Sequence, residues 1–123
     1  MRRQKSQGIR RMLRAFSSSG KGFAGAFREE AAFRQELLFA CLALPLALWL
    51  GRSGVERALL AAPVLLILIV ELLNSAIEAV VDRSGMERNR LAGMAKDMGS
   101  AAVLLSFILL GTVWFLVLFD HFR

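Results

Sequence analysis

The feature that most constrains the fold is an apolar run of twenty-two residues, 98–119, that contains no charged side chain. A helix of about twenty such residues can cross the hydrocarbon core of a bilayer. Hydrophobic residues make up 56% of the 123 residues, and a chain this short has too little interior to bury them all. The surplus must face lipid. We therefore expect an all-α integral membrane protein with a single domain.

Two further apolar segments precede this run, at residues 37–50 and 55–70. The first has only fourteen residues, so its helix must include residues 31–36 to reach the length of a span. We predict membrane helices over residues 31–50, 55–82 and 98–119, with loops at 51–54 and 83–96. Cys41 stands alone in the first segment, which excludes a disulfide within the chain and favours a small buried side chain.

The N-terminal thirty residues have a different pattern. Residues 1–8 are predicted to be a flexible basic tip, and residues 9–30 an amphipathic surface helix. Apolar side chains recur at helical spacing from Ile9 to Phe27, with basic residues between them. Such a helix is suited to lie in the headgroup layer of a membrane. The Ser-Ser-Ser-Gly run at 17–20 is expected to break or loosen it.

The positive charge is distributed as in a membrane protein. Nine of the sixteen Lys and Arg residues lie in the first thirty-four positions, and four more lie between residues 83 and 96. Because basic residues near span ends remain on the cytoplasmic side, we predict a cytoplasmic N-terminus and an external C-terminus. No zinc-finger or ribonucleoprotein motif is present, so a nucleic-acid partner is not expected.

The polar chemistry is concentrated in the segment VELLNSAIEAVVDR at 70–83. At 100° per residue, Glu71, Asn74, Glu78 and Asp82 fall within an arc of about 80° on one helix face. An unpaired carboxylate in hydrocarbon costs several kcal/mol, so the row needs partners, and a hard divalent cation prefers such oxygen ligands. The competing interpretation is a cytoplasmic helix end with solvated charges and one structural ion pair.

Two other polar groups accompany this row. Glu29 and Glu30 precede the first predicted span, and the segment 84–100 carries further acidic and basic residues up to Lys96 and Asp97, which is expected to open the third helix. Acidic runs are usually solvated, and a lysine there can serve as an interfacial anchor. No phosphate-binding glycine loop and no protein-kinase signature is present.

Three blocks of the sequence resemble the signature blocks of the prokaryotic diacylglycerol kinase family, especially its Gram-negative branch. They are EAAFRQE at 30–36, VELLNSAIEAVVDR at 70–83 and AKDMGSAAV at 95–103. The resemblance implies a homotrimer of three-span subunits with a surface helix. It also implies ATP- and Mg²⁺-dependent phosphorylation of diacylglycerol to phosphatidic acid.

The resemblance also implies roles for individual residues. Glu71 is expected to be the general base, and Glu30 and Glu78 are expected to hold Mg²⁺. The nucleotide is expected to contact Arg11, Glu30, Glu78, Glu87, Arg88, Asn89, Lys96 and Asp97. The lipid substrate is expected to contact Glu36, Trp49, Arg57, Glu71, Asn74 and Ser100.

Alternatives remain at the level of function and of assembly. The related Gram-positive branch phosphorylates undecaprenol, so a polyprenol is the second candidate substrate. A proton or cation pathway built on the polar row and a non-catalytic assembly subunit are the non-kinase alternatives. In the trimer, Glu71 is expected to work with Asp97 of a neighbouring chain in a composite site, although a site within one chain is also compatible with the short 83–96 connection.

Overall fold

Four long helices make up the described part of the chain. A computed structural model describes residues 2–83 and 89–123, and the side chains among them from Gln7 on. Within those ranges the helices are α1 (Arg2–Glu29), α2 (Ala31–Leu50), α3 (Gly54–Arg83) and α4 (Arg90–His121). Helices α2, α3 and α4 are each long and apolar enough to cross a membrane. The predicted class, three membrane helices and an N-terminal helix in an all-α protein, is confirmed.

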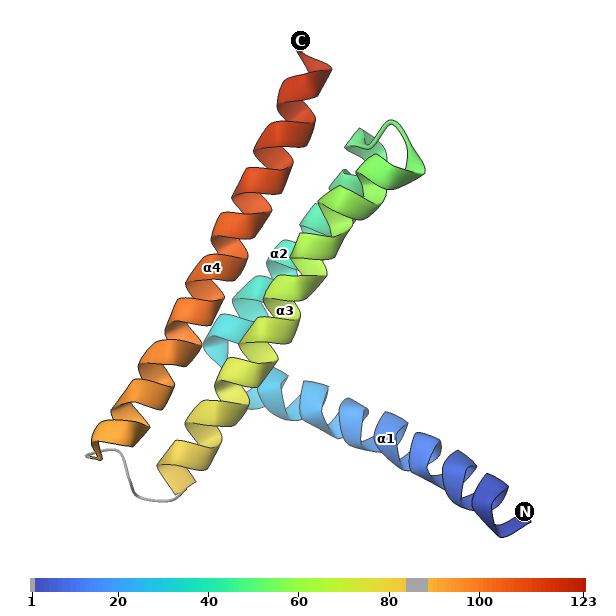
Figure 1. Cartoon of the computed structure of the whole chain (residues 1–123), viewed down its shortest axis with the longest axis vertical. Coiled ribbons are helices and arrows are strands. Elements are labelled where there is room, and N and C mark those ends of the chain that lie inside the picture. Colours follow the sequence, from blue (N-terminus) through green and yellow to red (C-terminus); the bar gives the residue numbers. More distant parts are fainter. Residues whose placement is uncertain (1, 84–88) are drawn as a thin grey trace.

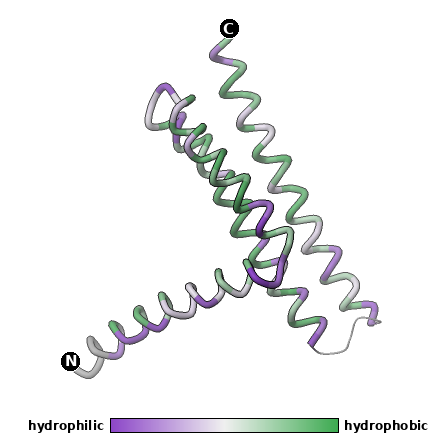
Figure 2. The backbone as a smooth tube through the Cα atoms, turned by 180° about the vertical axis from the view of Figure 1, so that it is seen from behind, coloured by the Kyte–Doolittle hydropathy of each residue, from purple (hydrophilic) through white to green (hydrophobic). Residues whose placement is uncertain are grey.

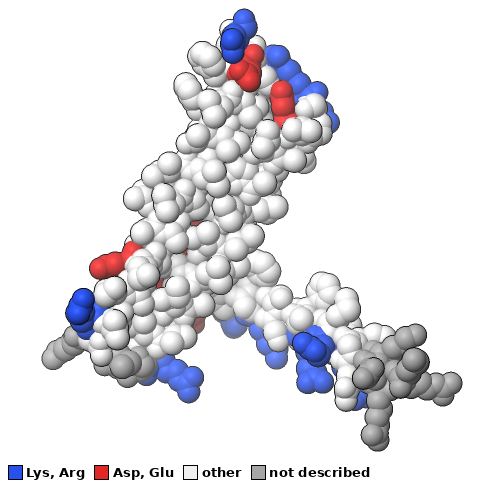
Figure 3. All heavy atoms as spheres, viewed as in Figure 1, with Lys and Arg blue, Asp and Glu red and all other residues white. Residues whose placement is uncertain are grey.

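Helix α3 packs against both α2 and α4, and in Figure 1 α4 lies beside α3 while α2 lies behind it. Helix α1 leaves the bundle at its junction with α2, and α3 and α4 extend beyond that junction (Figure 1). The three bundle helices are hydrophobic over most of their length, whereas polar and apolar positions alternate along α1 (Figure 2). Charged side chains gather at the two ends of the bundle and along α1, which leaves an apolar band between them (Figure 3).

The core runs along one face of α3. Leu60, Val64 and Ile67 are almost completely buried and recur at intervals of three or four residues, as expected for one helix face. Helix α2 opposes them with small residues at positions 40, 43 and 47, all buried alanines, which allow close helix approach. Across the bundle, the Trp114 indole nitrogen donates to the Leu60 carbonyl oxygen at 2.9 Å.

Two predictions about α1 are wrong. The helix begins at Arg2, so the supposedly flexible tip at 1–8 is helical from Arg2 on. It also continues unbroken through the Ser-Ser-Ser-Gly run at 17–20. The Ser19 hydroxyl donates to the Ala15 carbonyl at 2.8 Å, a back-bond that accommodates serine within a helix. The expected amphipathic helix is therefore longer than predicted.

The corner between α1 and α2 lies at Glu30, whose backbone is extended (φ −118°, ψ 108°). Arg34, one turn into α2, donates from Nη1 to the Phe27 carbonyl at 2.7 Å. Basic side chains commonly satisfy the last carbonyls of a helix in this way. The Phe23 ring of α1 packs against the buried Phe33 ring of α2, with the ring centroids 6.3 Å apart. These contacts hold Glu30 at the start of α2, where α1 joins the bundle.

The third membrane helix begins earlier than predicted. Asn89 is the N-cap of α4, and its side-chain oxygen accepts from the Leu91 amide at 2.8 Å. Asparagine is among the best N-cap residues, a signal that the prediction of a loop over 83–96 missed. Lys96 and Asp97 therefore lie within the second turn of α4 instead of opening it. Helix α4 extends to His121 instead of ending at 119.

At the end of the bundle where α2 ends and α3 begins, contacts around Glu56 join the helices. The Ser53 hydroxyl accepts from the Glu56 amide at 3.1 Å as a cap of α3. The Glu56 carboxylate lies 2.7 Å from His121 Nε2 of α4. Arg57 Nε donates to the Leu48 carbonyl of α2 at 3.0 Å.

The single chain leaves Cys41 exposed, so its predicted burial is wrong for the isolated subunit.

Candidate functional site

The candidate site begins with two polar residues on the buried face of α3. Glu71 and Asn74 retain only 5% and 8% of their exposure. They continue, one turn further along, the face that carries Leu60, Val64 and Ile67. Because buried carboxylates and amides require partners, their surroundings define what this part of the molecule can do. The polar row from Glu71 to Asp82 was predicted to share one helix face, and this prediction is correct for Glu71 and Asn74.

Glu71 faces a second carboxyl group from α2. The side chains of Glu36 and Glu71 lie close to each other across the two helices. Glu36 lies in the second turn of α2, close to the corner at Glu30. The two helices thus bring a pair of carboxyl groups together near the start of α2.

Three buried acceptor or hydroxyl atoms around this pair have no hydrogen-bond partner among the described residues. They are Glu36 Oε2, Asn74 Oδ1 and Ser75 Oγ. Buried polar atoms are usually satisfied, so these three atoms lack partners that the described part of the single chain does not supply. Ser75 was not among the predicted site residues.

Asn74 also organises the next turn of α3. Its Nδ2 donates to Glu78 Oε1 at 3.4 Å, and Glu78 is half-buried. On the other side Asn74 contacts α4 at Gly99, where an added Cβ would overlap Asn74 Oδ1. Gly99 is buried at the α3–α4 contact and was missed in the sequence. Gly99 shares one α4 face with Ala92 and Lys96, and this spacing was the sequence signal that could have placed it at the contact with α3.

The last member of the row pairs with α4. Asp82 is exposed, and its Oδ1 lies 2.7 Å from Lys96 Nζ. The ion pair places a cationic group at the inner end of the α3–α4 contact, two turns below Asn74 along α3. It also supports the alternative of a structural ion pair for this one carboxylate, with a lysine as the partner.

The predicted metal ligands can be tested by their chemistry. Glu30 and Glu78 both lie close enough to Glu71 to act on its charge. Among the residues described, no three acidic, histidine or cysteine side chains are grouped as a complete metal cage. Mg²⁺ typically uses one or two carboxylates and completes its shell with phosphate oxygens and water. Glu30 and Glu78 supply carboxylates of the number and type that Mg²⁺ typically takes from a protein.

A groove of about 570 Å³ adjoins this cluster between α1 and α3. Its lining includes Glu29, Glu30 and Ser75, and small residues of both helices form most of the remainder. The volume is within the range of small-molecule sites. The groove therefore places open space directly beside the carboxylates.

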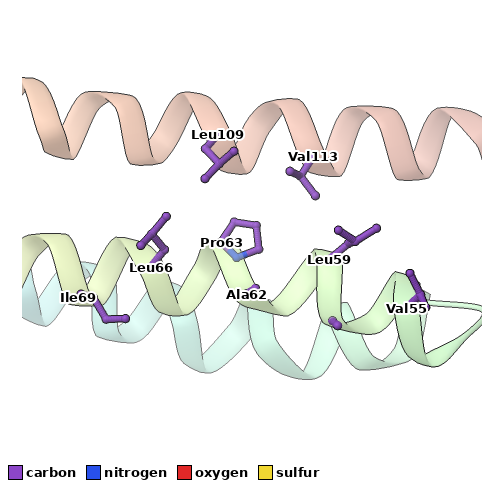
Figure 4. Close-up of a pocket in the computed structure, with 9 residues that line it drawn as sticks. Val55, Leu59, Ala62, Pro63, Leu66, Ile69, Leu109 and Val113 are labelled. Atoms are coloured by element: carbon purple, nitrogen blue, oxygen red, sulfur yellow. The ribbon is translucent and has the colours of Figure 1, made fainter.

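A second groove, of about 600 Å³, lies between α3 and α4 and is lined only by apolar side chains. Figure 4 shows Leu66 of α3 and Leu109 of α4 pointing toward each other across it, with Pro63 and Val113 beside them. No lining residue can transfer a proton or bind a phosphate, so this groove is not a candidate for chemistry.

Two predicted lipid contacts, Trp49 and Arg57, lie away from the cluster. Arg57 is fourteen residues from Glu71 on α3, or about 21 Å along the helix. Trp49 is exposed near the end of α2, at the same far end of the bundle. The structure therefore does not bring either residue to the carboxylates of its own chain.

Two predicted nucleotide contacts, Arg11 and Asp97, are also separated from Glu71 and its neighbouring carboxylates within one chain. Arg11 is nineteen residues before Glu30, or about 28 Å along α1. Asp97 is exposed and lies roughly 160° around α4 from Gly99, facing away from α3. Ser100, a predicted lipid contact, is exposed as well. Asn89 caps α4, and Glu87 and Arg88 lie outside the described residues.

Fold and site together define a small three-span membrane protein with one buried carboxylate, Glu71, and the half-buried Glu30, Glu36 and Glu78 near it. Residues 17–118 match the sequence profile of the family described as prokaryotic diacylglycerol kinase. The chain is 50% identical to the "Diacylglycerol kinase" of Escherichia coli (strain K12) over 115 residues, 94% of each chain. It is 44% identical to that of Haemophilus influenzae over 94% of this chain and 98% of the other. It is 50% identical to that of Pseudomonas aeruginosa over 90% of each.

The chain therefore belongs to the prokaryotic diacylglycerol kinase family. The predicted family and the predicted enzyme class, a kinase, are confirmed.

Proposed function

We propose that this protein transfers the γ-phosphoryl group of ATP to the free hydroxyl of diacylglycerol, giving phosphatidic acid, at the cytoplasmic face of the bacterial inner membrane. The observation that carries the proposal is the buried Glu71 carboxyl group, close to Glu36 and to polar atoms that have no partner among the described residues. Such a group can accept a proton from a ligand hydroxyl. The diacylglycerol kinases named above supply the substrate class.

In this reaction the lipid hydroxyl donates its proton to the Glu71 carboxylate as its oxygen attacks the γ-phosphorus. The bond between the γ-phosphorus and the β–γ bridging oxygen breaks, and ADP leaves with the electron pair. Glu36 Oε2, which is buried and has no partner among the described residues, could accept a hydrogen bond from a water molecule beside the lipid hydroxyl. Phosphoryl transfer depends mainly on such positioning and on charge neutralisation.

Charge neutralisation is assigned to two groups. Glu30 and Glu78 would hold Mg²⁺, which neutralises phosphate charge when it is bound. Lys96, held beside α3 by Asp82, would contact the phosphates of ATP. Basic residues of α1 add positive potential along the same membrane face.

The active assembly is proposed to be a homotrimer with composite sites. Asp97 faces away from α3 of its own chain, and Arg11 is remote from its own carboxylate cluster, as their placement above shows. Both residues can therefore serve a nucleotide only beside another subunit. A closed ring of identical subunits would repeat such a site at each interface.

Orientation follows from the distribution of charge. Nine Lys and Arg precede α2 or lie in its first turn, and four lie between residues 83 and 96, against three elsewhere. This asymmetry favours a cytoplasmic N-terminus and an external C-terminus, which puts the carboxylate cluster on the side where ATP is available. A reporter fused after Arg123 should be active outside the cytoplasm. Activity of that reporter only inside would reverse the proposed orientation.

The function is tested by supplying purified protein with ATP, Mg²⁺ and either diacylglycerol or undecaprenol in detergent micelles. Phosphatidic acid formed faster than undecaprenyl phosphate, and only with Mg²⁺ present, is the expected result. A preference for undecaprenol would assign the polyprenol kinase activity instead. Absence of lipid-dependent ATP turnover in folded protein would reject the kinase proposal and favour an ion pathway or an assembly subunit.

A further inference from the structure

Gly99 differs from the other glycines of α4 in what surrounds it. A Cβ atom added at Gly99 would overlap Asn74 Oδ1 and lie 3.2 Å from Asn74 Cγ. At Gly93 and Gly111, on the same helix, an added Cβ would meet nothing within 4 Å. Gly99 is also buried in the α3–α4 contact, whereas Gly111 is exposed. Only Gly99, of these three, has a space requirement that the structure explains.

The Asn74 side chain has little freedom to accommodate an extra atom. It is 92% buried, and its Nδ2 donates to Glu78 Oε1 at 3.4 Å. Rotation of the amide away from α4 would break that bond to Glu78. Displacement of α4 would instead strain the Lys96–Asp82 ion pair, which joins the same two helices at 2.7 Å. Either response changes the polar row.

We propose that Gly99 is a positioning residue of the kinase site: its missing side chain holds Asn74 against α4, and Asn74 in turn orients the Glu78 carboxylate. The inference rests on the proposed function, in which Glu78 holds Mg²⁺. A hydrogen bond to a metal-ligating carboxylate orients it and commonly changes metal affinity or activity by about 10–100-fold when it is lost. Gly99 thus acts through Asn74 and does not touch substrate or metal itself.

The experiment compares Gly99→Ala with Gly93→Ala and Gly111→Ala as matched controls. For each full-length variant, the Mg²⁺ concentration that gives half-maximal diacylglycerol phosphorylation and the melting temperature without nucleotide are measured. Gly99→Ala should raise the Mg²⁺ midpoint about tenfold or more and lower the melting temperature. The controls should keep the wild-type Mg²⁺ midpoint and melt at or above the wild-type temperature, since alanine favours a helix over glycine.

Asn74→Ala supplies the second arm, because it removes the side chain that the new Cβ would meet. In that background Gly99→Ala should no longer lower the melting temperature, as contacting residues are non-additive. Its Mg²⁺ midpoint should equal that of Asn74→Ala alone. This double variant keeps the proposal testable even if Gly99→Ala alone does not fold.

An unchanged Mg²⁺ midpoint in Gly99→Ala, with active wild type and controls, would overturn the inference while leaving the proposed function intact. Equal loss of melting temperature in both backgrounds would also overturn it, because the obstruction would then not be Asn74. A folded wild type that phosphorylates no lipid would overturn the proposed function, and the role of Gly99 with it. In that case the melting temperatures would still report whether Gly99 and Asn74 are in contact.

Discussion

The two halves of α3 present the same face to the bundle with opposite chemistry. From Leu60 to Ile67 that face is apolar and almost completely buried. From Glu71 onward it carries Asn74 and Glu78, and burial decreases toward the exposed Asp82. Helix α4 runs beside both halves, whereas α3 extends beyond the start of α2 (Figure 1).

The comparison separates packing from function. The half of α3 from Leu60 to Ile67, which we call the outer half, requires only side chains of complementary shape. Alanines of α2 and the Trp114 indole of α4 supply them. Around the half that begins at Glu71, which we call the inner half, Glu36 Oε2 of α2 and Asn74 Oδ1 and Ser75 Oγ of α3 have no partner among the described residues. Buried polar groups in membrane helices are costly and mark functional sites. We therefore assign stability mainly to the outer half and chemistry to the inner half.

The largest effect is expected from Glu71→Gln. Glutamine keeps the size of the side chain and can donate to Glu36, but it cannot accept the substrate proton. Turnover should fall by about two to four orders of magnitude, the usual range for loss of a general base. Steady-state phosphorylation of diacylglycerol measures this loss. Turnover close to wild type would remove Glu71 from the mechanism.

The next effect concerns the metal. Glu30→Gln and Glu78→Gln should each raise the Mg²⁺ concentration required for half-maximal activity, by ~10–100-fold if each supports the same ion. The double variant should be little worse than the poorer single variant, because residues that act as a unit are non-additive. Titration of activity with Mg²⁺ tests this, and strictly multiplicative losses would show that the two carboxylates serve separate purposes.

A smaller effect is expected when two kinds of inactive subunit are mixed: the kinase activity should recover to about a quarter of the wild-type value. Glu71→Gln and Asp97→Asn subunits are unfolded together, reassembled at equal ratio and assayed. In a closed ring with composite sites, random assortment leaves about a quarter of the sites with both residues intact. Cross-linking supplies the control for mixed assembly. If mixed oligomers form but remain inactive, each site lies within one chain.

The smallest effect on stability should come from Asp82→Asn, at the exposed end of the inner half. Both partners of the Lys96–Asp82 pair are substantially exposed, and such pairs contribute about 0–1 kcal/mol. The melting temperature should therefore change little. Thermal unfolding monitored by circular dichroism measures it, and a large decrease would mean that the inner half also carries much of the stability.

The sequence predicted most of the fold, because apolar length and helical periodicity depend on local composition. The three spans and the shared face of Glu71 and Asn74 follow from such patterns. The continuity of α1 did not, since Ser17–Gly20 resembles a helix break until the Ser19 back-bond is seen. The contact between Gly99 and Asn74, and the pairing of Glu71 with Glu36, join different helices. Single-helix periodicity cannot locate either one.

The most direct test of the division within α3 compares Ile67→Ala with Glu71→Gln, two substitutions one turn apart on the same buried face. Turnover and melting temperature are measured on both proteins in the same detergent. Ile67→Ala should lower stability by about 2–5 kcal/mol, as for a buried isoleucine, with turnover per folded molecule near wild type. Glu71→Gln should keep or raise the melting temperature while turnover is lost, because a neutral amide is easier to bury than a carboxylate. Parallel losses of turnover and stability in both variants would contradict the account.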